Sequence, residues 1–146
     1  MMKNIIAAID LENERQRNDI LRVAAEYASA FNAKLWILHV ALDSPGPADF
    51  EAGPQTVRDR VSFEARTEHR ELQNLAKKTA EENGIEATPL MIKGLVADEI
   101  LEHAERRDAE LIVVGHRHRS GLVAALMGDP TRDVLGKAKR PVLVVP

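Results

Sequence analysis

The sequence contains no cysteine, which excludes disulfide bonds, thiol catalysis and thiolate metal ligands, and agrees with a cytoplasmic location. Aromatic residues make up only 3% of the 146 residues, so the core has to be built from Val, Ile, Leu and Ala. No apolar run approaches the roughly 18 residues that a membrane span requires. Asp10 interrupts the N-terminal segment too early for a secretory signal. We expect one cytoplasmic domain, residues 1–146, with no membrane segment.

A strong excess of one charge is also missing. The formal net charge is −3, which argues against a general nucleic-acid-binding protein. The charge is nevertheless uneven along the chain. Residues 116–146 carry six Lys and Arg against two Asp, a net charge of +4, which leaves −7 for the other 115 residues. A basic C-terminal quarter attracts small anions, although a solvated loop and helix surface accounts for the same pattern.

Short apolar runs alternate along the chain with amphipathic, more polar segments. The runs predict buried strands at about 3–9, 34–40, 86–93, 109–115 and 140–146. The segments between them predict helices at about 14–31, 57–83, 94–104 and 129–138. In the last helix, Asp129 suits the N-cap and Pro130 the first helical position. Residues 41–56 are rich in proline and glycine and predict a loop.

The order of these elements determines the expected fold class. Strands that alternate with helices indicate a parallel sheet covered by helices on both faces. The strands are almost continuously apolar, as expected when both faces of a sheet are buried. Pro89 indicates an edge strand or a strand start for the third run. We therefore predict a single doubly wound α/β domain without internal repeats.

Three segments carry a family resemblance. They are "AAID" at the end of the first strand, "LHV" at the end of the second, and "AELIVVGHRHRSGLVAALMGDPTRDVLGKAKRPVLVV" at residues 109–145. In their order and spacing they resemble the universal stress protein family along nearly the whole chain. The resemblance implies a Rossmann-like, five-stranded parallel sheet of order 3-2-1-4-5. Ligands of such open sheets bind at the carboxyl ends of the strands, where Asp10 and Gly115 would face each other.

The glycine-rich loop departs from the pattern of the ATP-binding members that it resembles. Those members carry Gly-x-x-Gly, nine residues, and then Gly-Ser/Thr. The corresponding positions here are Gly115, His118, Gly128 and Asp129, so two of the four differ. The His118 side chain occupies space beside the phosphates. The Asp129 carboxylate caps the helix by accepting hydrogen bonds from the amides that would otherwise bind a phosphate. Its negative charge also repels a polyphosphate.

The resemblance also assigns ligand contacts. Asp10 would hydrogen-bond a ribose hydroxyl, main-chain groups of Val40 would contact an adenine edge, and Thr131 keeps a hydroxyl in the following helix. Arg117 and its neighbours offset part of the Asp129 charge, so we expect weak or altered binding of ATP, ADP or AMP. The candidate cofactor-binding residues are Ala8, Ile9, Asp10, Val40, Val114, Gly115, Arg117, His118, Gly128, Asp129, Pro130 and Thr131.

Neither a catalytic motif nor a metal site is predicted. The sequence has no Gly-x-Ser-x-Gly segment and no Walker motif. His116 and His118 are separated by one residue, but they lack a predicted carboxylate nearby, and solvated side chains explain them better. We interpret His39 as a packed residue with one satisfied nitrogen, and His69 and His103 as surface residues.

The last strand suggests a partner. Residues Pro141 to Pro146 are apolar and would form an exposed sheet edge, which favours pairing with a second copy across a twofold axis. Members of the family that this chain resembles commonly dimerise in this way, whereas a cover from loop 41–56 is the alternative. We expect a non-catalytic, homodimeric stress-response protein. The alternatives are an interaction module that has lost nucleotide binding and a weak ATP hydrolase.

Overall fold

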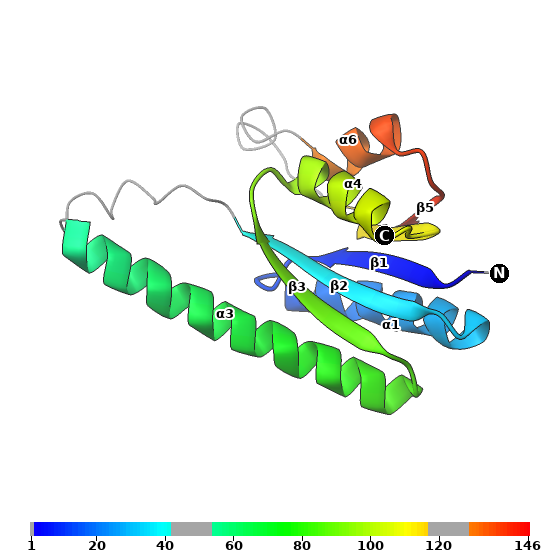
Figure 1. Cartoon of the computed structure of the whole chain (residues 1–146), viewed down its shortest axis with the longest axis horizontal. Coiled ribbons are helices and arrows are strands. Elements are labelled where there is room, and N and C mark those ends of the chain that lie inside the picture. Colours follow the sequence, from blue (N-terminus) through cyan, green and yellow to red (C-terminus); the bar gives the residue numbers. More distant parts are fainter. Residues whose placement is uncertain (1, 42–53, 117–128) are drawn as a thin grey trace.

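The computed structural model describes residues 2–41, 54–116 and 129–146. Its centre is one sheet of five parallel strands in the order β3-β2-β1-β4-β5 (Figure 1). The sequence-based prediction of a doubly wound α/β domain with this strand order is therefore confirmed. The strands are β1 (Asn4–Ile9), β2 (Lys34–Ala41), β3 (Ala87–Lys93), β4 (Leu111–Gly115) and β5 (Val142–Val145).

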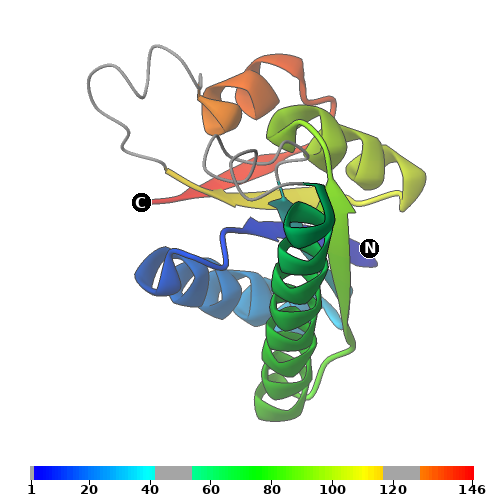
Figure 2. The same cartoon turned by 90° about the vertical axis from the view of Figure 1, so that its left-hand side faces the viewer.

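Helices cover both faces of the sheet. Figure 2 shows α1 and α3 on one side and α4 and α6 on the other. None of the helices in the described ranges is both long and apolar enough to cross a bilayer. The helices are α1 (Glu14–Phe31), α3 (Pro54–Asn83), α4 (Val96–Arg106) and α6 (Pro130–Lys137).

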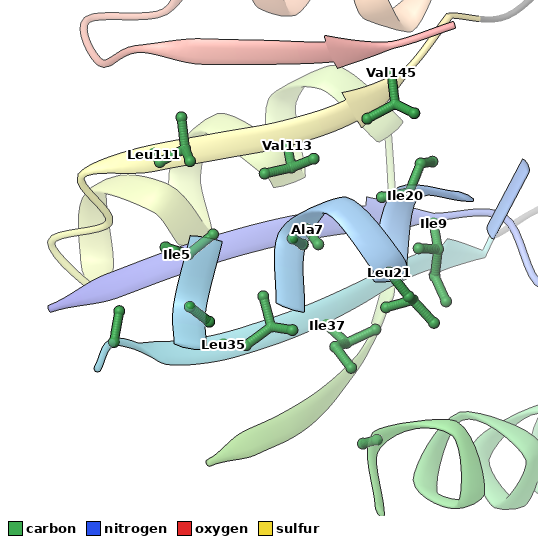
Figure 3. Packing of buried hydrophobic residues seen from close by; sticks show 14 of the residues in the cluster. Ile5, Ala7, Ile9, Ile20, Leu21, Leu35, Ile37, Leu111, Val113 and Val145 are labelled. Carbon is green, nitrogen blue, oxygen red and sulfur yellow. The ribbon is translucent and has the colours of Figure 1, made fainter. Parts of the chain in front are cut away.

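Alternate residues of each central strand supply the two cores. In β1, Ile5 and Ala7 belong to the cluster beneath α1 and α3, whereas Ile6 packs into the cluster beneath α4 and α6. Figure 3 shows the first cluster, in which β1, β2 and β4 present Ile, Leu, Val and Ala to Ile20 and Leu21 of α1. The sheet is thus buried on both faces, which explains why its strands lack polar alternation.

The sequence locates the proline of β3 correctly, but it does not show which aromatic residues of α1 are buried. Pro89 lies in β3, an edge strand of the sheet, as expected for a residue without an amide hydrogen. Tyr27 and Phe31 have helical spacing with Ala24 and Ala28 in the sequence, but they do not extend the buried face of α1, because they are 38% and 42% exposed. They lie on the flank of a helix whose buried stripe ends at Ala28.

The prediction that His103 is a surface residue is wrong. Its side chain is 5% exposed and lies on the buried face of α4 with Ile100 and Ala104. Its Nδ1 accepts a 2.6 Å hydrogen bond from Nη1 of Arg107. Glu102 and Glu105, which flank His103 in the sequence, are exposed, so they do not report its own environment.

Candidate functional site

The carboxyl ends of β1 and β4 form the switch point of the sheet. The two strands are neighbours, with Ile5 opposite Leu111 and Ala7 opposite Val113. The chain leaves β1 toward α1 on one face, and α6 follows β4 on the other (Figure 1). Connections that leave in opposite directions open a crevice at this edge, and this is the common ligand position in open α/β sheets.

Asp10 lies immediately after β1 and closes a tight turn at this edge. Its Oδ1 accepts a 3.0 Å hydrogen bond from the amide of Glu12, and its carbonyl accepts a 3.1 Å bond from the amide of Asn13. Asn13 then caps α1, because its Oδ1 accepts a 3.1 Å bond from the amide of Gln16. The turn and the cap together place the half-buried Asp10 at the start of the crevice.

Gly115 ends β4 beside two side chains of α1. A Cβ atom on Gly115 would lie 2.5 Å from Nε2 of Gln16 and 2.8 Å from Cδ1 of Ile20. The same Gln16 nitrogen donates a 2.9 Å hydrogen bond to the carbonyl of His116. Side-chain packing supplies a specific reason for this glycine. Glycine leaves room for the Gln16 and Ile20 side chains at the end of β4.

Thr131 joins α6 to the same strand end. Its side chain is 7% exposed, and its hydroxyl donates a 2.6 Å hydrogen bond to the carbonyl of Gly115. A hydroxyl has a single proton. While Thr131 donates to Gly115, it has no proton to offer a phosphate oxygen.

Asp129 caps α6, as the sequence predicts. Its Oδ1 accepts a 3.2 Å hydrogen bond from the amide of Arg132, its carbonyl accepts from the amide of Asp133, and Pro130 follows as the first helical residue. The N-terminus of α6 therefore already holds one carboxylate of this chain. A second carboxylate, Asp133, lies within the first turn.

The other predicted site residues divide between the two faces of the sheet. Ala8, Val40 and Val114 pack toward α4 and α6, whereas Ile9 packs toward α1. The structure thus brings these strand-end residues to one edge, with Asp10, Gly115 and the α6 N-terminus around them. Three further candidates, Arg117, His118 and Gly128, lie outside the described residues.

His39 is a site residue whose position the sequence analysis did not identify. It is 6% exposed, and its Nδ1 lies 3.3 Å from the carbonyl oxygen of Ile9 and 3.4 Å from the amide nitrogen of Leu11. Its Nε2 lies 3.8 Å from Oε2 of Glu68 on α3. The only available signal was its position beside Val40 at the end of the second strand, which does not reveal contacts across 30 residues of chain.

Potential metal ligands do not cluster in the part of the chain that the structure describes. Within it, no three His, Asp or Glu residues come together in a way that suits a metal ion. A hollow of about 510 Å³ lies elsewhere, between α4 and the segment that joins α6 to β5. Its lining includes Leu101 and Arg106 of α4, Ile112 of β4, Lys137 at the end of α6, and Arg140.

These features define a class of protein. The chain is a doubly wound α/β domain with a Rossmann-like strand order, an acidic residue after β1 and a capped helix N-terminus beyond β4. A family model described as "Universal stress protein family" matches residues 1–146. The chain belongs to the universal stress protein family.

Individual relatives agree with this assignment. The chain is 31% identical to the universal stress protein YxiE of Bacillus subtilis over 99% of both chains. It is also similar to a universal stress protein solved in complex with cAMP, with a TM-score of 0.68, 19% identity, and coverage of 99% of this chain and 96% of that one. An Archaeoglobus fulgidus universal stress protein in complex with dAMP gives a TM-score of 0.66 and 22% identity, covering 100% of this chain and 98% of that one.

Proposed function

We propose that this protein binds an adenine nucleotide in the crevice between β1 and β4 and acts in the stress response without catalysing a reaction. Asp10 would accept from a ribose hydroxyl and main-chain groups of Val40 would contact the adenine. Two structural neighbours hold adenine mononucleotides, cAMP and dAMP, which supports this ligand class. Arg132, in the first turn of α6, lies on this side of the sheet and favours an anion there.

The cap of α6 sets the expected phosphate preference, and this single observation carries the proposal. The Asp129 carboxylate accepts from the amide of Arg132, where a helix N-terminus would otherwise hold phosphate oxygens. Two like charges about 4 Å apart repel by about 4 kcal/mol at an effective dielectric constant near 20, or roughly a thousandfold in affinity. A terminal phosphate that reaches α6 meets this repulsion, whereas a monophosphate has fewer charges to bring there. We propose a preference for AMP over ATP.

The sheet edge at β5 supports a homodimer. The carbonyl oxygens of Pro141 and Val145 accept hydrogen bonds from β4 and the residue after it, namely from the amides of Ile112 and His116. Main-chain groups of successive strand residues point to alternate sides. The groups of Val142 and Val144 therefore point to the open edge, where an antiparallel second copy would pair with them.

Titration calorimetry with ATP, ADP and AMP, each with and without magnesium, tests the proposed function. We expect saturable heat with AMP and weaker binding of ATP. If none of the three nucleotides gives heat at protein concentrations that reveal millimolar affinity, the crevice is not a nucleotide site. The chain would then act through its dimer and surface as an interaction module. Phosphate release from ATP above a blank would contradict a non-catalytic function.

A further inference from the structure

The imidazole of His39 contacts the main chain on both sides of Asp10. Its Nδ1 lies 3.3 Å from the carbonyl of Ile9, the residue before Asp10, and 3.4 Å from the amide of Leu11, the residue after it. His39 itself is the β2 residue that pairs with Ile9. The ring is buried, so water does not compete for these groups. One side chain of β2 thus lies against both peptide units that carry the Asp10 side chain, and its Nδ1 can form a hydrogen bond with one of them at a time.

The two Nδ1 contacts belong to opposite tautomers, because Nδ1 donates to the Ile9 carbonyl when it carries the proton and accepts from the Leu11 amide when Nε2 does, so the surroundings of Nε2 decide between them. The amide of Leu11 has only a proton to give, so Nδ1 accepts when this hydrogen bond forms. The ring proton then lies on Nε2, which faces Oε2 of Glu68 at 3.8 Å. A carboxylate on that side favours a proton on the facing nitrogen. Glu68 of α3 therefore supports the tautomer that leaves Nδ1 free to accept from Leu11.

A second side chain holds the same turn from the other direction. Nη1 of Arg17 donates to the carbonyl of Leu11 and forms a 2.7 Å ion pair with Oε1 of Glu71 on α3. Leu11 is thereby held at its amide by His39 and at its carbonyl by Arg17. Both supports are completed by carboxylates of α3, three residues apart.

We propose that His39 is a positioning residue for nucleotide binding, which sets the orientation of the Asp10 carboxylate toward the ribose, and that Glu68 maintains the required tautomer. This inference rests on the proposed function, because it assigns the ribose contact to Asp10. A carboxylate whose main chain is fixed loses little freedom when it accepts a hydrogen bond from a ligand. A mobile turn would weaken that contact without removing any atom that touches the nucleotide.

Substitutions of His39 separate positioning from general packing. His39→Asn retains an acceptor near the place of Nδ1, whereas His39→Leu retains approximate volume but no acceptor. We expect His39→Leu to weaken AMP binding by about tenfold, the effect of one lost hydrogen bond to a ligand. We expect His39→Asn to remain within about threefold of the unmodified protein. His69→Asn, on the exposed side of the same helix as Glu68, is the matched control and should change nothing.

A modified nucleotide identifies the contact through which His39 acts. 2′,3′-Dideoxy-AMP lacks the hydroxyls that Asp10 would hold, so it should bind more weakly than AMP and equally to the unmodified protein and to His39→Leu. A substitution that merely damages the fold would weaken AMP and dideoxy-AMP alike. Long-range ¹⁵N NMR of the ring supplies a second readout. We expect the Nε2–H tautomer in the unmodified protein and a shift of the tautomer equilibrium in Glu68→Gln.

The outcomes separate this inference from the proposed function. If the unmodified protein binds no AMP, the proposed function fails and the positioning role fails with it. If it binds AMP but His39→Leu binds equally well, the inference alone is overturned. Equal losses of AMP and dideoxy-AMP in His39→Leu, or an Nδ1–H tautomer in the unmodified protein, would also overturn it.

Discussion

The hydroxyl of Thr131 donates a 2.6 Å hydrogen bond to the carbonyl oxygen of Gly115, joining the first turn of α6 to the end of β4. Replacing Thr131 by Val keeps the shape of the buried side chain but leaves the carbonyl without this donor. Loss of a buried partner costs about 1–3 kcal/mol. We therefore expect Thr131→Val to lower the free energy of unfolding in urea by about this amount. Thr131→Ser keeps the hydroxyl and should cost clearly less; equal losses in the two variants would contradict the importance of this bond.

The packing of α1 side chains against the end of β4 predicts that replacement by alanine should affect the stability of the protein differently at Gly115 and at Gly136. Gly115→Ala places a Cβ 2.5 Å from Gln16 and 2.8 Å from Ile20. Gln16 can move away only by giving up its hydrogen bond to His116, and Ile20 is buried, so this overpacking should cost about 1–3 kcal/mol in the free energy of unfolding. A Cβ atom on Gly136 in α6 would have nothing within 4 Å, so Gly136→Ala should be neutral or stabilising by up to about 1 kcal/mol. Thermal or urea unfolding that ranks the variants in the opposite order would refute the packing argument.

The buried His103 predicts a pH dependence of stability. Burial, together with the charges of Arg107 and Arg106, lowers the pKa of His103 below its usual value of 6.5, and Glu99 and Glu102 oppose this only in part. The folded state therefore binds fewer protons than the unfolded state as the pH falls through this region. The contribution of the neutral, buried His103 to the free energy of unfolding is fully present above pH 6.5. It declines at lower pH, where the unfolded state takes up a proton that the folded state does not.

Unfolding experiments at several pH values check this sign. The free energy of unfolding should fall from about pH 7 toward about pH 5, the range in which histidine titrates. His103→Gln should flatten this part of the curve, because it removes the titrating group. His69→Gln, at an exposed position of α3, should leave the slope unchanged. A slope that survives in His103→Gln would show that another group causes it.

The orientation of the main-chain groups of β5 predicts that one substitution should disrupt the proposed dimer without disturbing the fold of the protomer. The amide of Val144 points away from β4, as the alternation from Val145 implies. Val144→Pro removes this donor without removing a hydrogen bond to β4. In light scattering at micromolar concentration, we expect a dimer for the unmodified protein and for Val144→Ala, and a monomer for Val144→Pro. A monomeric unmodified protein, or a dimeric Val144→Pro, would refute edge pairing.

Most of the fold was predictable because its signals are local. Apolar runs such as residues 34–40 mark strands buried on both faces, and Asp129 with Pro130 marks a helix start whose cap the structure confirms. Periodicity is less informative at the border of a buried stripe. Tyr27 and Phe31 have helical spacing with Ala24 and Ala28, but only packing decides which flank of α1 the sheet covers.

The site was less predictable because its contacts span long distances in sequence. The family resemblance placed Asp10 and Gly115 at one edge of the sheet, and the order of the strands confirms this placement. The reason for Gly115 is Gln16, about 100 residues earlier, and no local pattern reveals that pair. The sequence predicts only that His39 is packed, since its contacts with the turn after β1 arise when β2 pairs with β1.

The Asp129 cap predicts that one substitution changes the choice of nucleotide. Serine at position 129 still caps the helix well, but it removes the negative charge from the N-terminus of α6. We expect Asp129→Ser to strengthen ATP binding by at least about tenfold and to leave AMP binding within about threefold. Adding His118→Gly should strengthen ATP binding further. Asp133→Asn removes an equal charge four residues further along α6, so it is the matched control for a general charge effect and should strengthen ATP binding less than Asp129→Ser does.

The ratio of the ATP and AMP affinities, measured by calorimetry in the unmodified protein and in Asp129→Ser, tests the central claim most directly. The carboxylate at the α6 cap predicts that the unmodified protein binds AMP more tightly than ATP and that Asp129→Ser shifts this ratio toward ATP. Tight ATP binding by the unmodified protein, with a ratio that Asp129→Ser leaves unchanged, would contradict it.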